Sequence, residues 1–251
     1  MVKVRNTIIG EGIPKICVPI VGQTKADIIN EAKTFHEMPL DMVEWRGDWF
    51  NDIFDFDKVN EVLAGLRDVL GDEPILFTFR TSNEGGEKSI KWSDYTRLNR
   101  QVAATGWVDL IDVEVFSGDD IVKEVIEAAH HYGVKVVASN HDFYETPSKE
   151  EIIRRLRKMK DLGADIPKIS VMPTCKKDVL TLLEATLEMK ESHPECPIIT
   201  MSMKGEGVIS RLTGEVFGSA LTFGAASKVS APGQIKVKDL NRMLQLLHQS
   251  L

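Results

Sequence analysis

One lysine lies inside an apolar segment, where burial would change its chemistry. Lys168 stands in Ile166-Pro167-Lys168-Ile169-Ser170-Val171-Met172, a run typical of a buried strand. Burial disfavours the ammonium form, and nearby arginines such as Arg46, Arg80 and Arg211 would disfavour it further, so we expect a lowered pKa. A neutral amine attacks a carbonyl to form a Schiff base, which makes Lys168 the candidate nucleophile. The alternative is a lysine at a strand start whose ammonium reaches solvent.

A histidine and several carboxylates follow other apolar runs. His141 has an ordinary pKa near neutrality, which suits a proton shuttle, and the alternative is a structural hydrogen-bonding residue. Glu44, Glu84 and Glu114 could orient His141 or bind substrate hydroxyls, and we expect at least one of them to pair with an arginine instead. Asp112 and Glu114 could hold a divalent metal, but no histidine joins them at ligand spacing. We therefore predict no metal site.

The last third of the chain adds groups that could bind an anion. Arg211 suits bidentate capture of a carboxylate or phosphate. The segment from Ser230 to Gln234 is small and polar enough for a closing lid, and an ordinary turn is the alternative. Met203 and Phe223 are expected either in the plain core or as walls of the pocket.

The elements that must position these residues repeat with a regular spacing. Eight apolar runs alternate with helical segments, at residues 16–21, 42–45, 75–79, 110–115, 134–139, 168–172, 198–203 and 219–226. This alternation over about 250 residues predicts one (β/α)8 barrel domain spanning residues 1–251. An open doubly wound sheet is the alternative, but Val21-Gly22-Gln23-Thr24 after the first run is no Gly-rich fingerprint. Residues 1–12 are expected to form a β-hairpin that closes the barrel floor.

Local signals mark the ends of the helical segments. Gly71, Gly106, Gly133 and Gly163 each follow one, which suits a residue that accepts the left-handed conformation. Ser148 followed by Glu151 predicts a capping box at a helix start, and Thr24 with Asp27 is a weaker signal of the same kind. In a barrel, the carboxyl ends of the strands meet at one rim, so we expect the candidate residues to converge there.

Composition and charge exclude several classes of protein. The chain of 251 residues has 31 Lys+Arg against 38 Asp+Glu, a net charge of −7, which argues against nucleic-acid binding. Three widely separated cysteines give no disulfide or zinc pattern, so we expect reduced thiols and a cytoplasmic protein. Neither a secretory signal nor a run of ~18 apolar residues is visible, and no membrane association is expected.

Seven blocks of sequence, taken in order, resemble one known family. They are Glu44-Trp45-Arg46, Phe79-Arg80-Thr81-Ser82-Asn83-Glu84-Gly85-Gly86, Ser139-Asn140-His141-Asp142-Phe143, Pro167-Lys168-Ile169-Ser170-Val171-Met172-Pro173, Thr200-Met201-Ser202-Met203, Gly207-Val208-Ile209-Ser210-Arg211 and Ser230-Ala231-Pro232-Gly233-Gln234. Over essentially the whole chain, the sequence is similar to the type I 3-dehydroquinate dehydratases. The resemblance implies a barrel that dehydrates 3-dehydroquinate to 3-dehydroshikimate, in the shikimate route to aromatic amino acids.

The resemblance also implies a role for each matching residue. Lys168 matches the Schiff-base lysine, His141 the general acid/base and Glu84 the carboxylate that orients the histidine. Arg211, Ser230 and Gln234 match a clamp on the substrate carboxylate, and Glu44, Arg46 and Arg80 match the residues around the ring hydroxyls. No cofactor beyond the covalent imine is implied, and the family suggests a homodimer. Pro19 departs from relatives that carry serine, so a polar substrate contact at this position is in doubt.

Two alternatives compete with the dehydratase. A class I aldolase on a similar barrel would share the lysine but break a carbon–carbon bond, and many aldolases need a phosphate site in place of the carboxylate clamp. A catalytically silent barrel that binds metabolites or proteins is the second alternative. The joint presence of Lys168, His141 and Glu84 argues against it.

Overall fold

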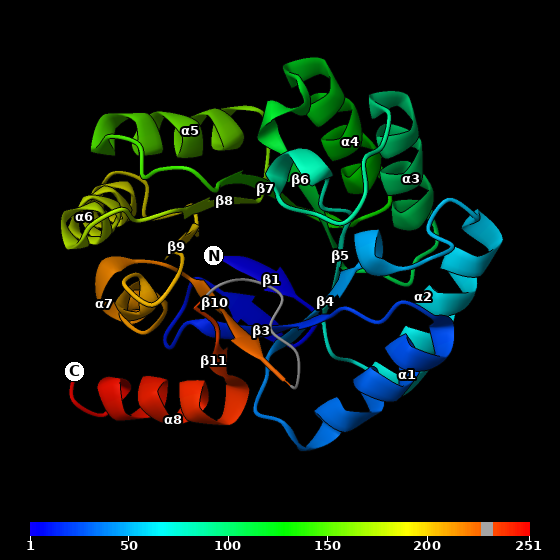
Figure 1. Cartoon of the computed structure of the whole chain (residues 1–251), viewed down its shortest axis with the longest axis horizontal. Coiled ribbons are helices and arrows are strands. Elements are labelled where there is room, and N and C mark those ends of the chain that lie inside the picture. Colours follow the sequence, from blue (N-terminus) through cyan, green and yellow to red (C-terminus); the bar gives the residue numbers. More distant parts are fainter. Residues whose placement is uncertain (227–232) are drawn as a thin grey trace.

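Parallel strands surrounded by helices make up most of the molecule (Figure 1). The computed structural model describes residues 1–226 and 233–251. Within these ranges the barrel strands are β3 (Lys15–Ile20), β4 (Met42–Arg46), β5 (Ile75–Thr78), β6 (Leu110–Glu114), β7 (Lys135–Asp142), β8 (Ile166–Val171), β9 (Ile199–Ser202) and β10 (Leu221–Ala225). Each predicted apolar run corresponds to one of these strands, which confirms the predicted alternation.

The strands pair in chain order and close on themselves. Each of β3 to β8 pairs in parallel with the next strand, and β10 pairs in parallel with β3. A parallel bridge between Ile198 and Ser219 joins the last two strands, and the amide of Ala220 donates to the carbonyl of Ile198. The short strand β11 (Ile235–Lys236) adds to β10 at the edge. The (β/α)8 barrel expected from the sequence is confirmed.

Helices cover the outside of the barrel. They are α1 (Lys25–Lys33), α2 (Phe56–Leu70), α3 (Trp92–Ala104), α4 (Asp119–His131), α5 (Lys149–Asp161), α6 (Lys176–Ser192), α7 (Gly214–Phe217) and α8 (Val237–His248). Their apolar stripes pack on the outward side chains of the strands, as Ile152, Leu156 and Met159 of α5 do. Within the described residues, no helix combines the length and the apolar character needed to cross a membrane.

The predicted helix ends are largely confirmed. The four expected glycines all have positive φ, from 57° to 101°. The side chain of Ser148 accepts from the amide of Glu151 at the start of α5, which is half of the predicted box. Thr24 and Asp27, the weaker signal, form the complete reciprocal box at the start of α1. The signal expected to be weaker, Thr24 with Asp27, thus gives the complete capping box. The reason is that the Asp27 side chain reaches back to the cap residue, which is not found for Glu151.

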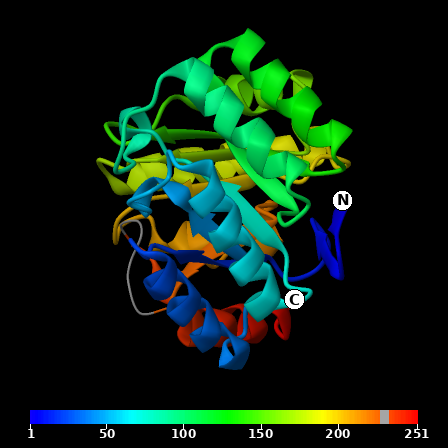
Figure 2. The same cartoon turned by 90° about the vertical axis from the view of Figure 1, so that its right-hand side faces the viewer.

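The chain begins with an antiparallel hairpin, β1 (Val2–Val4) and β2 (Thr7–Ile9). Its buried residues Val2, Val4 and Ile9 pack against the inward side chains at the start of the barrel strands, including Met42 and Leu110. Figure 2 shows the hairpin at one end of the barrel. The prediction that residues 1–12 close the barrel floor is confirmed, and the opposite rim is left for chemistry.

Candidate active site

Strand register brings the candidate residues to the inside of one rim. Because side chains alternate along a strand, Glu44 and Arg46 on β4 both point into the barrel. In the pairing of β7 with β8, Ser139 lies opposite Lys168 and His141 lies opposite Ser170. The pocket at this rim is lined by Glu44, Arg46, Arg80, Glu84, Gly85, His141, Phe143, Lys168, Ser170, Met201, Met203, Arg211, Phe223 and Gln234. Of the predicted site residues, all but Ser230 therefore share one pocket, and Ser230 lies outside the described residues.

Lys168 is buried in the middle of its strand. It is the third residue of β8, and its side chain is 4% exposed, so the alternative of a strand-start lysine that reaches solvent is wrong. Its Nζ lies 3.6 Å from Oδ2 of Asp112, 3.9 Å from Oε1 of Glu44 and 4.5 Å from the ring centroid of Phe223. Its nearest ionic partners are thus carboxylates, whereas the sequence had suggested arginines.

The contacts of Arg80 explain why arginines do not surround Lys168, because the Arg80 guanidinium pairs with carboxylates. Its Nη2 lies 2.8 Å from Oδ1 of Asp112, and its Nη1 donates to Glu114 and Ser139 at 3.0 and 2.9 Å. Although burial opposes the charged form, these carboxylates and Glu84 hold the pKa of Arg80 well above its ordinary value. Glu114 also accepts from the backbone and hydroxyl of Thr81. Glu114 therefore pairs with an arginine in a structural network, as expected for at least one of the three glutamates, and Glu84 also lies 3.6 Å from Nη1 of Arg80.

His141 and Glu84 form a hydrogen-bonded pair on the pocket side of Lys168, since His141 lies opposite Ser170, two residues beyond the lysine. Nδ1 of His141 lies 2.9 Å from Oε2 of Glu84, which also accepts from the His141 amide at 2.9 Å. Burial, together with Arg80, Lys168 and Arg46, holds the pKa of His141 well below its ordinary value. Burial raises the pKa of Glu84 to about 8, although Arg80 opposes the shift. With Glu84 engaging Nδ1, Nε2 is the nitrogen that can exchange a proton with a substrate.

Arg46 is held by a carboxylate that the sequence analysis did not single out. Its Nε and Nη2 donate to the two oxygens of Asp48, each at 2.8 Å, in bidentate geometry. Asp48 is fully buried and also accepts from the amides of Arg80 and Glu87. It thereby ties the ends of β4 and β5 together. The only signal in the sequence was an acid two residues after Arg46, and that pattern is common on solvent-exposed turns.

Arg211 enters the pocket from the turn after β9. Ser210 fixes this turn, because its hydroxyl accepts from the Ser202 amide and donates to the Gly207 carbonyl. Glycine is required at position 207, since a Cβ there would lie 2.3 Å from the Ser202 carbonyl oxygen. Arg211 is almost fully buried, with Nη1 3.8 Å from the sulfur of Met201, and burial lowers its pKa to about 10. The guanidinium is still charged at neutral pH and remains suited to an anion.

Comparison with known proteins agrees with this geometry. A family model described as type I 3-dehydroquinase matches residues 16–251. The chain belongs to the type I 3-dehydroquinase family. A 3-dehydroquinate dehydratase of Clostridioides difficile is 59% identical over 250 residues, covering 100% of this chain and 98% of the relative, and one of Clostridium botulinum is 57% identical over 251 residues, covering 100% and 99%. The expected class of enzyme, a type I 3-dehydroquinate dehydratase and thus a hydro-lyase, is confirmed at the level of the family.

Solved structures of the same family share the fold. A type I 3-dehydroquinate dehydratase from Clostridium difficile with covalently modified comenic acid aligns with a TM-score of 0.97 at 59% identity, covering 100% of this chain and 98% of that one. A 3-dehydroquinate dehydratase from Geobacillus kaustophilus aligns with a TM-score of 0.96 at 39% identity, covering 99% and 96%. The barrel, with its N-terminal hairpin, is therefore the fold of this family.

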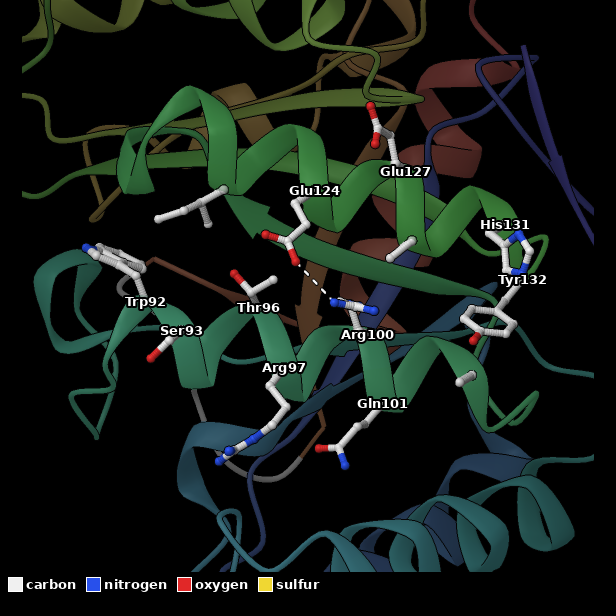
Figure 3. A pocket seen from close by; sticks show the side chains of 13 residues that line it. Trp92, Ser93, Thr96, Arg97, Arg100, Gln101, Glu124, Glu127, His131 and Tyr132 are labelled. Atoms are coloured by element: carbon white, nitrogen blue, oxygen red, sulfur yellow. Dashed lines mark hydrogen bonds and ion pairs between the residues drawn. The ribbon is translucent and has the colours of Figure 1, made fainter.

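A larger hollow lies outside the barrel, away from every predicted site residue. It occupies about 1050 Å³ between α3 and α4, where Arg100 pairs with Glu124 (Figure 3). Its charges are exposed, and such pairs contribute little to stability or to ligand affinity. We place the functional site at the rim, because buried and mutually compensated charges, not size, distinguish it.

Sequence reasoning missed some of the rim residues. Ser170 was detectable, because it follows Lys168 by two positions and so faces the same way. Phe143 lies two residues beyond His141, and it contacts the position where a Cβ of Gly85 would stand. Pro19 lies buried on β3 opposite Glu44 and is not among the residues that line the pocket.

Proposed function

We propose that this chain dehydrates 3-dehydroquinate to 3-dehydroshikimate through an imine on Lys168, as a step of the shikimate route. The observation that carries the proposal is a buried lysine amine in the same pocket as a hydrogen-bonded His141–Glu84 pair. A proton next to a ketone is weakly acidic, and hydroxide is a poor leaving group. The pocket supplies a group for each difficulty, an amine to replace the ketone oxygen and an imidazole to move the proton.

The residues of the pocket can supply and accept every proton in the proposed reaction. The Lys168 amine adds to the ketone, and the adduct loses water to leave a protonated imine, which is an electron sink. His141, with Nδ1–H held by ionised Glu84, takes the neighbouring carbon's proton on Nε2. The resulting enamine expels the hydroxyl group, which leaves as water with the proton from His141. Hydrolysis then returns the ketone and the free lysine, so the reaction needs neither a metal nor an organic cofactor.

The remaining residues of the rim bind the anionic substrate. We assign the carboxylate to Arg211 and Gln234, together with Ser230. Glu44 and the donors of Arg46 that Asp48 does not engage face the ring hydroxyls. Arg80 contributes mainly through its charge and the carboxylates it holds. Met203 and Phe223, both buried, form the apolar walls.

Reductive trapping tests this proposal directly. Borohydride added with 3-dehydroquinate should leave a stable adduct on Lys168, identified by peptide mass spectrometry. Lys135, at the opposite end of the neighbouring strand, should remain unmodified. A Lys168→Ala variant should lose formation of the conjugated product, measured by ultraviolet absorbance. An unmodified Lys168 under turnover conditions, or unchanged turnover in the variant, would contradict the imine mechanism.

Three further proposals concern the chain as a whole. We propose that residues 1–251 form a single domain, because the family model spans 16–251 and the hairpin before it packs into the barrel floor. We propose a homodimer on the family resemblance alone, and sedimentation analysis would test it. A cytoplasmic location is supported by the lack of a disulfide pattern among the three cysteines.

A further inference from the structure

The carboxylate of Asp112 faces the Lys168 amine from beneath the pocket. Its Oδ1 accepts from the Ser139 hydroxyl at 2.7 Å and lies 2.8 Å from Nη2 of Arg80. Among the described residues, its Oδ2 has no hydrogen-bond partner, although it lies 3.6 Å from Nζ of Lys168. Asp112 is fully buried and does not line the pocket. Because two donors hold Oδ1, the carboxylate cannot readily turn Oδ2 away from the lysine.

We propose that Asp112 is the counter-ion of the imine that forms on Lys168, a positioning residue that stabilises the positive charge of the protonated imine nitrogen. The inference rests on the proposed function, because only an imine on Lys168 needs such a partner. When water leaves the adduct, the nitrogen keeps one proton and a full positive charge, and no proton passes to Asp112. In a site shielded from water, a fixed carboxylate at this distance favours that charged nitrogen.

The surroundings support a permanent negative charge on Asp112. Burial alone would raise the pKa of its carboxyl, but Arg80, Lys168 and Ser139 outweigh burial and hold the pKa below its ordinary value. Asp112 therefore stays ionised and is suited to pairing with a cation, not to accepting a proton.

The other groups that face Lys168 have different tasks. Glu44 on β4 lies 3.9 Å from Nζ, but it lines the pocket and accepts from the Thr78 hydroxyl at 2.8 Å, so it is available to substrate. Cys17 on β3 stays a neutral thiol, because burial, followed by the charge of Glu44, raises its pKa well above the ordinary value. Asp112 is thus the carboxylate that remains with the lysine throughout the reaction.

Selective reduction of the protonated imine by cyanoborohydride tests the proposal. In Asp112→Asn, the pH above which trapping of 3-dehydroquinate on Lys168 declines should move down by about one pH unit or more. The same variant should lose about tenfold or more in kcat, with KM changed less than kcat. Asp109→Asn is the matched control, since Asp109 precedes the same strand and pairs with Arg67 at the barrel floor. It should leave both the trapping profile and kcat unchanged.

The outcomes separate the two proposals. If the unmodified protein forms no adduct on Lys168, the imine mechanism itself fails. If the adduct forms but Asp112→Asn shows the unmodified protein's trapping profile, the counter-ion assignment is wrong. Should Asp112→Asn fail to fold, the unmodified protein still provides a test. Its trapped yield should stay constant up to about pH 9, and a decline already between about pH 6 and 8 would overturn the assignment.

Discussion

The inside of the barrel changes from apolar to polar within two residues along the five strands β4 to β8, whereas β9 and β10 stay apolar. The lower row of inward side chains consists of Met42, Leu76, Leu110, Val137, Ile166, Ile199 and Leu221. Two residues further along the same strands, the upper row consists of Glu44, Thr78, Asp112, Ser139, Lys168, Met201 and Phe223. Both rows are buried, so burial alone does not decide which residue types a barrel interior accepts.

The difference lies in what each row contacts. The lower row packs on the hairpin residues Val2, Val4 and Ile9, which cover it from below, so a polar group there would find no partner. The upper row holds opposite charges close together, such as Lys168 and Asp112, and adjoins the pocket. Charges are tolerated there because each cation meets a carboxylate at short range. We therefore expect substitutions in the lower row to change mainly the stability of the protein, and substitutions in the upper row to change mainly its catalytic rate.

The largest expected effect on catalysis follows from His141, which lies two residues beyond Ser139 of the upper row on β7. His141→Asn should reduce kcat by about 10²–10⁴-fold, because no group then moves the proton, whereas the imine on Lys168 should still form. Steady-state rates combined with borohydride trapping would measure both. His130→Asn serves as the control, since His130 lies outside the barrel and pairs with Asp165. A variant at His141 that keeps full turnover would assign the proton transfer elsewhere.

A cavity in the lower row should have the opposite effect, a loss of stability with little change in kcat. Leu110→Ala, two residues below Asp112 on the same strand, should destabilise the protein by about 2–5 kcal/mol, because Leu110 is fully buried. The value of kcat should stay within about threefold of the unmodified protein. Urea unfolding and steady-state kinetics under folding conditions would test this. A tenfold loss of kcat without a loss of stability would show that the two rows are not separable.

Much of this contrast could be predicted from the sequence, because it follows from periodicity. The eight apolar runs matched the eight strands, and polar residues within or just after them marked the rim. Strand ends were less certain, since β7 continues through Asn140, His141 and Asp142, residue types that favour turns. Pairing of these residues with Ile169, Ser170 and Val171 on β8 overrides that local preference.

Contacts between charges could not be predicted from one sequence. The sequence shows several arginines near the rim, which led to the expectation that they surround Lys168. It does not show that Arg80 pairs with Asp112 and Glu114 instead. From the sequence, the role suggested for Asp112 is that of a metal ligand. Which carboxylate meets which cation depends on register and side-chain reach, to within one or two ångströms. Family resemblance supplied roles for the residues, but not these partnerships.

A substitution in the substrate-binding part of the rim should have a smaller effect on activity than one at His141. Arg211→Lys should raise KM for 3-dehydroquinate by about 10–100-fold with a smaller change in kcat, because an ammonium cannot hold a carboxylate in bidentate geometry. Steady-state kinetics would measure both constants. The matched control is Arg97→Lys, since Arg97 lines the outer hollow between α3 and α4 (Figure 3) and pairs with Asp94 of its own helix. An unchanged KM in Arg211→Lys would move the carboxylate site to another residue.

The smallest effect concerns pH and the Glu84–His141 pair above the upper row. When Glu84 is protonated, its proton faces Nδ1, and the ring proton must then lie on Nε2, so His141 cannot act as the base. Since burial raises the pKa of Glu84 to about 8, kcat/KM should fall as pH is lowered through about 8. Glu84→Gln should remove this decline and leave only one below pH 6.5, where His141 itself gains a proton. A Glu84→Gln profile identical to that of the unmodified protein would contradict the assignment.

The same shift has a consequence for stability, which provides an independent measurement. The pKa of Glu84 is higher in the folded protein, about 8, than the ordinary 4.5 expected in the unfolded chain. Its contribution to stability is therefore fully present below pH 4.5 and is lost as pH rises through about 8. Urea unfolding between about pH 5 and 9 should show this loss in the unmodified protein and a flatter dependence in Glu84→Gln. Equal slopes would mean that Glu84 is ionised throughout, held by Arg80 like the other carboxylates of the upper rows.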